Sequence, residues 1–191
     1  VIVDTTIANQ WYVNDTSLTG DGLTTTTGHD TFPGLDAAHP KRHIPSAMRL
    51  VTAGDTVNVD AGLYDSFVTV NGTETAGVNI TVDSLTLVGK DSSATVIDPP
   101  GPAALPGLYA INAENRYNLN IRNLGARGAQ CGMMLVNVDY SKFSGDSVAE
   151  NGNHGIYLLT GSDSNTVSNN IASFNSSYGI ELENASGNTL T

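Results

Sequence analysis

The sequence predicts an all-β solenoid, in which each repeat forms one turn of a coil. The first observation is a repeat, since three similar segments begin at Gly132, Gly155 and Gly179, at intervals of 23 and 24 residues. They read Gly-Met-Met-Leu, Gly-Ile-Tyr-Leu and Gly-Ile-Glu-Leu, and a weaker copy begins at Gly107, 25 residues before Gly132. The second observation is the alternation of polar and apolar residues, which is typical of β-strands. Short strands at such a period indicate a solenoid.

Composition agrees with this fold class and excludes several functions. The chain has 191 residues, which suit one domain, and only 14% of them are charged, against about 25% in a typical domain. Its net charge is −11, and no Lys or Arg follows Lys142. Nucleic acids and anionic membranes reward basic patches, so we expect neither as a partner. No apolar run reaches the roughly 18 residues of a membrane helix, and we expect no membrane insertion.

The first part of the chain, residues 1–53, is predicted to close one end of the coil. The segment Gln10-Trp11-Tyr12-Val13 is expected to be a strand, with its tryptophan sealing the end of the core. Residues 43–51 carry apolar side chains at helical spacing, with Pro45 in the first turn. We predict a short helix there that covers the first coil, because a bare terminal coil would expose an unpaired strand edge.

Residues 54–191 are predicted to form the coils, in one continuous domain with the first part. Alternating segments predict strands at residues 56–60, 67–70, 80–82 and 85–88, and the proline-rich residues 98–102 should loop out of the stack. Ile156 and Leu158 should point inward above Ile180 and Leu182. An Asn recurs at 151 and 175, which suggests a ladder of side-chain amides at a turn.

These repeats resemble a known superfamily, the right-handed parallel β-helices of the NosD-like and pectate-lyase-like kind. The resemblance rests on Asn153–Leu158, Ser164–Val167, Tyr178–Leu182 and Gly187–Leu190. The N-terminal half is similar to the leader of many such proteins, through Gly28–Asp30, Pro33-Gly34, Pro40-Lys41, Ala47-Met48, Ala53–Val57 and Ala61–Tyr64. The resemblance implies a right-handed parallel β-helix with a short N-terminal capping helix, in a secreted or cell-surface protein. It leaves function open, because one fold hosts many activities.

A column of outward positions is the candidate binding site. We expect Tyr109, Met134, Tyr157 and Glu181 at equivalent places on successive coils, where aromatic rings can stack on sugars and a carboxylate can accept hydroxyl hydrogen bonds. Glycan contact is therefore predicted for Tyr109, Tyr157 and Glu181. Packing against neighbouring strands or against another domain would explain the same column.

The remaining candidates for chemistry are weaker. Enzymes on the scaffold that this chain resembles act on acidic polysaccharides, but their motifs are absent here, and His154 is expected to stack on Tyr178 one coil on. His29, His39 and His43 lie near Asp30 and Asp36 without a metal-ligand spacing. Asp15, Asp21 and Asp30 could bind calcium, although turn formation suits them better. The single cysteine, Cys131, is expected in the core.

We therefore predict a non-catalytic extracellular module, structural or adhesive, that requires no cofactor and presents one face to a glycan or to a cell-surface partner. A polysaccharide lyase or epimerase is the alternative. The sequence stops at Thr191 in mid-coil, where we expect either a continuation or another chain. A filament subunit that self-associates through an open C-terminal coil is the third possibility.

Overall fold

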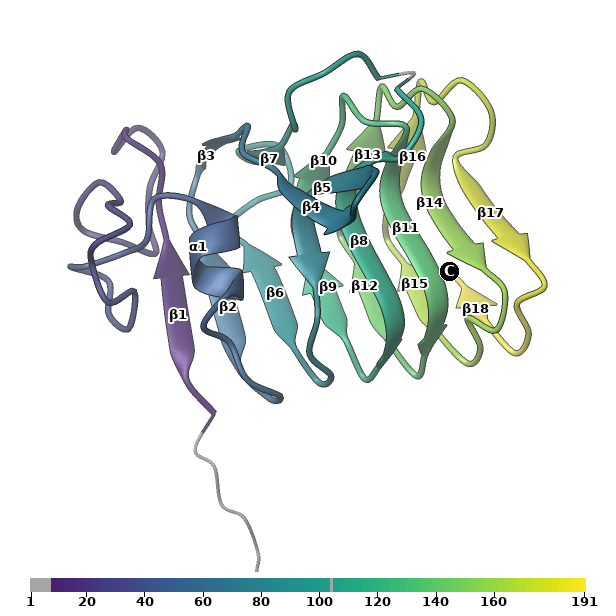
Figure 1. Ribbon diagram of the computed structural model, residues 1–191, viewed down its shortest axis with the longest axis horizontal. Coiled ribbons are helices and arrows are strands. Elements are labelled where there is room, and N and C mark those ends of the chain that lie inside the picture. Colours follow the sequence, from purple (N-terminus) through teal and green to yellow (C-terminus); the bar gives the residue numbers. More distant parts are fainter. Residues whose placement is uncertain (1–7, 104) are drawn as a thin grey trace, which may run out of the picture.

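The protein is a parallel β-helix. The computed structural model describes residues 8–103 and 105–191, and the strands in this part of the chain follow one another along the long axis of the molecule (Figure 1). They form three sheets, and each sheet takes one strand from each successive coil. Neighbouring strands within a sheet are therefore distant in sequence, as expected for a solenoid.

The three sheets have the following strands in spatial order. The seven-stranded sheet contains β1 (Gln10–Val13), β2 (Thr56–Val59), β6 (Thr86–Gly89), β9 (Asn120–Arg122), β12 (Lys142–Ser144), β15 (Thr166–Ser168) and β18 (Thr189–Leu190). The five-stranded sheet contains β16 (Ile171–Ser173), β13 (Ser147–Ala149), β10 (Gly125–Ala126), β7 (Thr95–Ile97) and β3 (Gly62–Tyr64). The six-stranded sheet contains β17 (Ile180–Glu183), β14 (His154–Leu159), β11 (Cys131–Asp139), β8 (Leu108–Tyr117), β5 (Glu74–Ile80) and β4 (Val68–Asn71).

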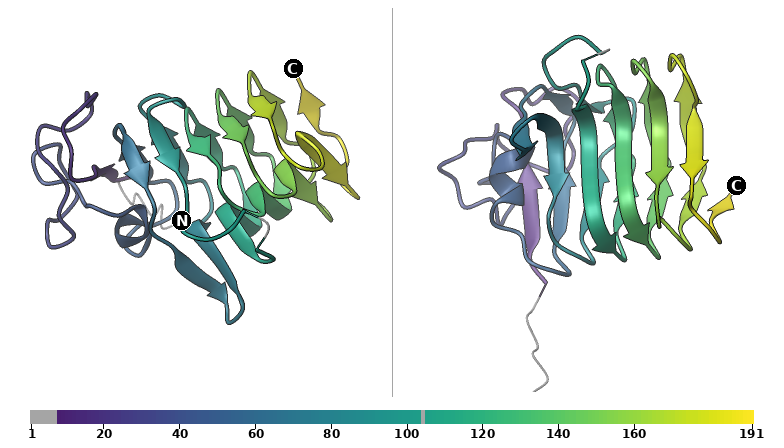
Figure 2. Two further views of the ribbon diagram at one scale, coloured as in Figure 1. Left: turned by 90° about the horizontal axis from the view of Figure 1, so that it is seen from above. Right: turned by 45° about the vertical axis from the view of Figure 1, so that its right-hand side comes forward.

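Every described strand pair is parallel except β4 with β5, which form an antiparallel hairpin. The hairpin turns at Asn71-Gly72, where the sequence predicts a turn but not a reversed pair. It projects from the side of the coil (Figure 2). The predicted strand at residues 80–82 lies largely outside β5, which ends at Ile80. Residues 98–102 belong to no strand, as their prolines predicted.

Stacked apolar side chains fill the interior. In the six-stranded sheet, Ile156 pairs with Ile180 and Leu158 with Leu182, as predicted, and the first member of each pair is fully buried. A second column in the seven-stranded sheet comprises Val57, Leu87, Ile121, Phe143 and Val167. Burial of each large side chain contributes about 1.5–3 kcal/mol, so these columns are the main stabilising term.

Asparagine side chains connect successive coils at the turns. The backbone N–H and the side-chain Nδ2 of Asn151 both donate to Asn175 Oδ1, at 3.1 and 3.0 Å. Asn165 N–H donates to Asn188 Oδ1 in the same way, at 2.8 Å. The predicted ladder is thereby confirmed.

The repeat glycines are explained by this ladder. A Cβ on Gly155 would lie 2.4 Å from Gly179 O and 2.8 Å from Asn175 Nδ2. A Cβ on Gly132 would meet Gly155 O at 2.8 Å. Because both distances are shorter than a real carbon contact, only glycine fits where one coil passes beneath the next.

The N-terminal end is covered by the predicted elements. β1 has the predicted bounds, and α1 (Ile44–Met48) is shorter than the predicted 43–51. Its residues Ile44, Ala47 and Met48 are buried against the first coil. Trp11 is also buried, and its Nε1 donates to Asp55 Oδ2 at 2.9 Å. In the part of the chain that the structure describes, no helix is both long and apolar enough to span a membrane.

Candidate functional site

The outer face of the six-stranded sheet carries two neighbouring rows of side chains. One row comprises Asn79, Asn112, Met134, Tyr157 and Glu181, which pair in register on β5, β8, β11, β14 and β17. The other comprises Ala76, Tyr109, Cys131 and His154. Members of a row are about 4.8 Å apart, the spacing of neighbouring strands. The column predicted from the repeats is therefore real for Met134, Tyr157 and Glu181.

The predicted place of Tyr109 in that column is wrong. Tyr109 pairs with Cys131, whereas Met134 pairs with Asn112. The weak repeat at Gly107 is thus three residues out of register with the later ones. Tyr109 is 4% exposed, because it packs with Cys131 and with Val70 of the β4–β5 hairpin. Its hydroxyl donates to Glu74 Oε1 at 2.8 Å, so it is not available as a glycan contact.

The ring of His154 contacts the rings of two tyrosines on this face. Its ring is parallel to that of Tyr178, with a centroid distance of 5.9 Å and an angle of 4°. It also lies 4.5 Å from the ring of Tyr157. The predicted stack on Tyr178 is confirmed, although His154 begins strand β14 and is buried rather than lying at a turn.

The imidazole faces a carboxylate without a hydrogen bond. His154 Nδ1 lies 3.0 Å from Glu181 Oε2, which is an ion-pair distance. The two groups are not aligned for a hydrogen bond, and Nδ1 is a buried polar atom with no hydrogen-bond partner. The contact between His154 and Glu181 is therefore an ion-pair contact, at a nitrogen that is enclosed by the protein.

Tyr157 connects the histidine to a second carboxylate. Its hydroxyl donates to Glu183 Oε2. Burial, together with that hydrogen bond and the charges of Glu183 and Glu181, raises the pKa of Tyr157, so the hydroxyl remains a donor at neutral pH. Glu181 and Glu183 are two residues apart on β17 and therefore point to the same face.

From the sequence, Tyr178 was predicted only as the stacking partner of His154, not as a glycan contact, and Glu183 was not singled out. Tyr178 is 57% exposed, so much of its ring surface is open to solvent, and Glu183 is exposed at the end of β17, where it accepts from the Tyr157 hydroxyl. The signal for Tyr178 was its position one repeat after His154, and the signal for Glu183 was its two-residue spacing from Glu181. We call the set His154, Tyr157, Tyr178, Glu181 and Glu183 the aromatic–acidic patch.

Cys131 is buried, as predicted, but not in the main core. It belongs to the small outer cluster with Ala76 and Tyr109. Burial raises the pKa of its thiol to about 11, with a further contribution from Glu181. The thiolate is the reactive form of cysteine, so Cys131 is unsuited to nucleophilic chemistry.

The opposite end of the same face is hollow. A cavity of about 500 Å³ lies between α1 and the hairpin and is lined by Met48, Arg49 and Phe67, among others. A smaller hollow of about 230 Å³ shares Asn79 and Thr81 with it. The row that ends at Glu181 therefore begins in a groove, although the aromatic–acidic patch itself is open surface.

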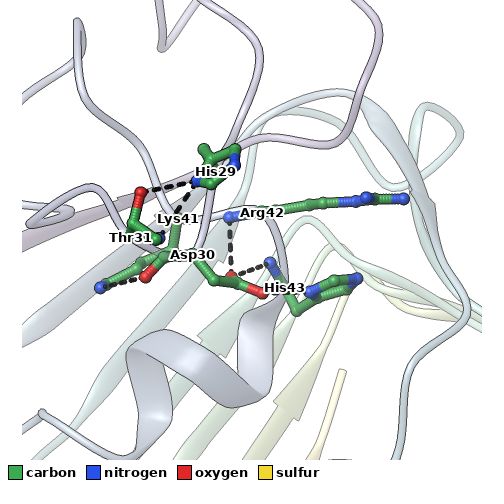
Figure 3. A network of polar contacts seen from close by, with 6 residues as sticks. All are labelled: His29, Asp30, Thr31, Lys41, Arg42 and His43. Atoms are coloured by element: carbon green, nitrogen blue, oxygen red, sulfur yellow. Dashed lines mark hydrogen bonds and ion pairs between the residues drawn. The ribbon is translucent and has the colours of Figure 1, made fainter.

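The N-terminal histidines do not converge. His43 Nδ1 lies 2.5 Å from Asp30 Oδ2, and Asp30 Oδ1 also accepts the backbone N–H groups of Arg42 and His43 (Figure 3). His29 Nδ1 lies 2.7 Å from Thr31 Oγ1. These contacts join two loops of the N-terminal segment, and they give each histidine a different partner.

His39 has a carboxylate of its own, with Nδ1 2.9 Å from Asp36 Oδ1. Asp15 accepts the backbone N–H of Ser17 and Asp21 accepts from Asn14, as expected of turn residues. Within residues 8–103 and 105–191, no three His, Cys, Asp or Glu side chains are grouped so that they could hold a metal. The described residues therefore include no cluster of ligands for the metal site considered at the histidines, and none for the calcium site considered at the aspartates.

The fold and this face define the class of protein. The family described as "Right handed beta helix region" matches residues 68–191, which is most of the chain. The protein therefore belongs to the right-handed β-helix family, as the sequence resemblance predicted. No curated protein matches the chain.

Two solved structures are similar in fold. A rhamnogalacturonan lyase aligns with a TM-score of 0.52 at 13% identity, over 96% of this chain and 50% of the lyase. A pectin methylesterase, solved in complex with hexasaccharide VII, aligns with a TM-score of 0.48 at 13% identity, over 69% of this chain and 46% of the esterase. The chain spans about half the length of these structures. At such identity, the likeness concerns the fold alone.

Proposed function

We propose that this chain is a non-catalytic β-helix module of an extracellular or cell-surface protein, and that it binds glycans through the outer face of its six-stranded sheet. The observation that carries the proposal is the exposed ring of Tyr178, held parallel to His154, whose Nδ1 lies 3.0 Å from Glu181 Oε2. Aromatic rings stack on the apolar faces of sugars, and carboxylates accept hydrogen bonds from their hydroxyl groups.

Preorganisation of the patch supports binding. The ring of His154 lies 4.5 Å from that of Tyr157 on the same strand, β14, and 5.9 Å from that of Tyr178 in the turn before β17. Side chains already held in place lose little conformational entropy when a ligand binds. A flat, fixed aromatic surface suits a sugar ring better than a flexible loop does.

The contacts of the carboxylates favour binding over catalysis. Glu181 faces His154 and Glu183 accepts from Tyr157, so neither is isolated as an acid or a base. The patch has donors, acceptors and stacking surfaces, which are the elements of recognition.

The test is a comparison of two exposed tyrosines. Binding of the chain to a panel of immobilised and soluble oligosaccharides is measured by calorimetry, and then Tyr178→Ala is compared with Tyr140→Ala. Tyr140 is also exposed, at 66%, but lies in the turn between β11 and β12. Loss of one stacked ring should weaken binding by about tenfold or more in Tyr178→Ala only. Equal affinity of the two variants would remove the patch from the binding site.

A polysaccharide lyase is the second candidate, because one of the two similar folds is a rhamnogalacturonan lyase. Incubation with rhamnogalacturonan and polyuronates, with and without calcium, separates the two candidates through the absorbance of the unsaturated product. Sustained turnover that follows the protein through purification would replace the binding proposal. Absence of product together with Tyr178-dependent binding would support it.

A further inference from the structure

The charges at the aromatic–acidic patch restrict its ligand. Glu181 is partly exposed and Glu183 is exposed, and both lie on the side of β17 that faces Tyr157. Among the described ion pairs, neither carboxylate contacts a Lys or Arg; the one basic group in reach is His154. The charged residues that act on the Tyr157 hydroxyl are likewise Glu183 and Glu181. The patch thus contains two carboxylates against one imidazole.

The basic residues of the chain lie elsewhere. All eight Lys and Arg residues occur at or before Lys142, and the net charge of the chain is −11. Arg49 lines the groove beside α1, and Arg116 contacts Asp83 at 3.5 Å. Both groups are at the other end of the face, three to four strands from β17, or at least about 14 Å at normal strand spacing. Salt at physiological strength screens charges over such distances, so these arginines do not neutralise the patch.

We propose that the aromatic–acidic patch selects uncharged sugars, and that it rejects glycans whose sugar rings carry carboxylate or sulfate. This inference rests on the proposed glycan-binding function and names its ligand class. A neutral sugar stacks on Tyr178 and donates a hydroxyl proton to Glu181, and the following sugar of the same chain reaches Glu183, two residues further along β17. An acidic sugar placed on Tyr178 brings a further negative charge towards Glu181, with no described Lys or Arg ion pair there to offset it.

The buried nitrogen of His154 strengthens this assignment. Nδ1 has no hydrogen-bond partner, although it lies 3.0 Å from a Glu181 oxygen. A sugar hydroxyl that donates to the other Glu181 oxygen leaves the contact between Glu181 Oε2 and His154 in place. An anionic ligand would push the carboxylate away from it instead.

The experiment uses matched pairs of oligosaccharides that differ only in charge. The pairs are β-1,4-linked glucose with β-1,4-linked glucuronate, β-1,4-linked mannose with β-1,4-linked mannuronate, and fully methyl-esterified with free oligogalacturonate, all of equal length. Affinities are measured by calorimetry in EDTA and again in excess calcium, because calcium can bridge carboxylates. We expect at least one neutral member to bind, and its acidic partner to bind about tenfold or more weakly in both conditions.

Removal of the two negative charges from the patch provides the control. The double variant with Glu181→Gln and Glu183→Gln keeps the shape of the patch but removes both charges, and it should narrow the difference within a pair. A thermal melt of this variant establishes that it is folded. An acidic member that binds as tightly as its neutral partner, in EDTA or in calcium, overturns the inference while the glycan-binding function remains. No Tyr178-dependent binding by any member overturns the proposed function itself.

Discussion

The ring of His154 lies parallel to the ring of Tyr178 one coil further along the chain, at an angle of 4° and with centroids 5.9 Å apart. The histidine is buried and the tyrosine is more than half exposed. A buried side chain of one coil here supports an exposed side chain of the next. The exposed ring has a fixed orientation because a buried ring lies behind it.

Removal of the supporting ring should affect both stability and binding. His154→Ala is expected to lower the free energy of unfolding by about 1–3 kcal/mol, since it removes a buried aromatic contact and leaves a void. It should also weaken glycan binding, because Tyr178 loses its support. His154→Phe keeps the stack and should retain most of the stability. Denaturant titration and calorimetry measure the two effects, and a His154→Ala protein indistinguishable from the parent would contradict this role.

Asp146 occupies a place that the repeat gives to asparagine. In the next coil the equivalent Asn170 donates from Nδ2 to Phe143 O at 2.9 Å. Asp146 has no such donor when it is ionised: Oδ1 accepts from Leu124 N–H at 2.9 Å, but Oδ2 is buried without a partner. Burial raises the pKa of Asp146 to about 7, from an ordinary value of 3.8.

The variant Asp146→Asn should therefore stabilise the protein, and more so at higher pH. The native state keeps its proton between about pH 4 and pH 7, where the unfolded chain has lost it, so the stability contributed by this group falls as pH rises through that range. Above about pH 7 the variant should exceed the parent by about 1–3 kcal/mol. Denaturant unfolding at several pH values measures this, and a difference that does not change with pH would refute it.

Asp60 should show the opposite dependence. It is buried and accepts hydrogen bonds from the backbone N–H groups of Gly22, Leu23, Thr24 and Ala61. Burial alone would raise the pKa of Asp60, but these bonds outweigh it and hold the pKa below 3.8. A lowered native pKa gives stability that is present above about pH 4 and is lost as pH falls through the native value.

Asp60→Asn is thus expected to lower the free energy of unfolding by about 2–4 kcal/mol at neutral pH, because the single oxygen of a neutral amide cannot accept from all these donors. Asp65→Asn, at an exposed aspartate, is the control and should cost less than about 0.5 kcal/mol. Chemical denaturation near pH 7 compares them. A similar loss of stability in both variants would show that the hydrogen bonds to Asp60 do not stabilise the protein.

The repeat glycine should not tolerate a side chain. Gly155→Ala would place a methyl group 2.4 Å from Gly179 O, and we expect it to lower the free energy of unfolding by about 1–3 kcal/mol or more. Gly22→Ala is the matched control, because its Cβ would meet only the flexible end of Lys90, at 3.0 Å. The melting temperatures of the two variants should differ clearly, and equal values would contradict the proposed crowding.

The sequence was sufficient for the fold and for part of the candidate site. Where the repeats are strong, as at Gly155 and Gly179, the register followed from the sequence, because the same glycine and asparagine contacts recur in each coil. The predicted register was wrong at Tyr109, because the weak copy that begins at Gly107 does not mark the residue that pairs with Gly132. The hairpin that buries Tyr109 involves contacts between β4 and β5 that follow from no repeat.

The members of the patch were only partly predictable for a different reason. Alternation places Tyr157 and Glu181 outward, but it does not say how a side chain rotates. The contact between His154 and Glu181, and the exposure of Tyr178, depend on such rotations and on the turn before β17. These are tertiary features, and repeat spacing carries no information about them.

The amide ladder at the turns has a consequence for how such a molecule changes in length. The side-chain Nδ2 of Asn151 donates to Asn175 Oδ1 in the coil that follows, at 3.0 Å, and to Ala126 O in the coil that precedes, at 3.2 Å. The same bond recurs one coil on, where Asn175 Nδ2 donates to Val148 O at 3.0 Å. Duplication or deletion of one whole coil within these later repeats would keep such junctions chemically intact, so evolution can lengthen or shorten this part of the scaffold without a new kind of interior.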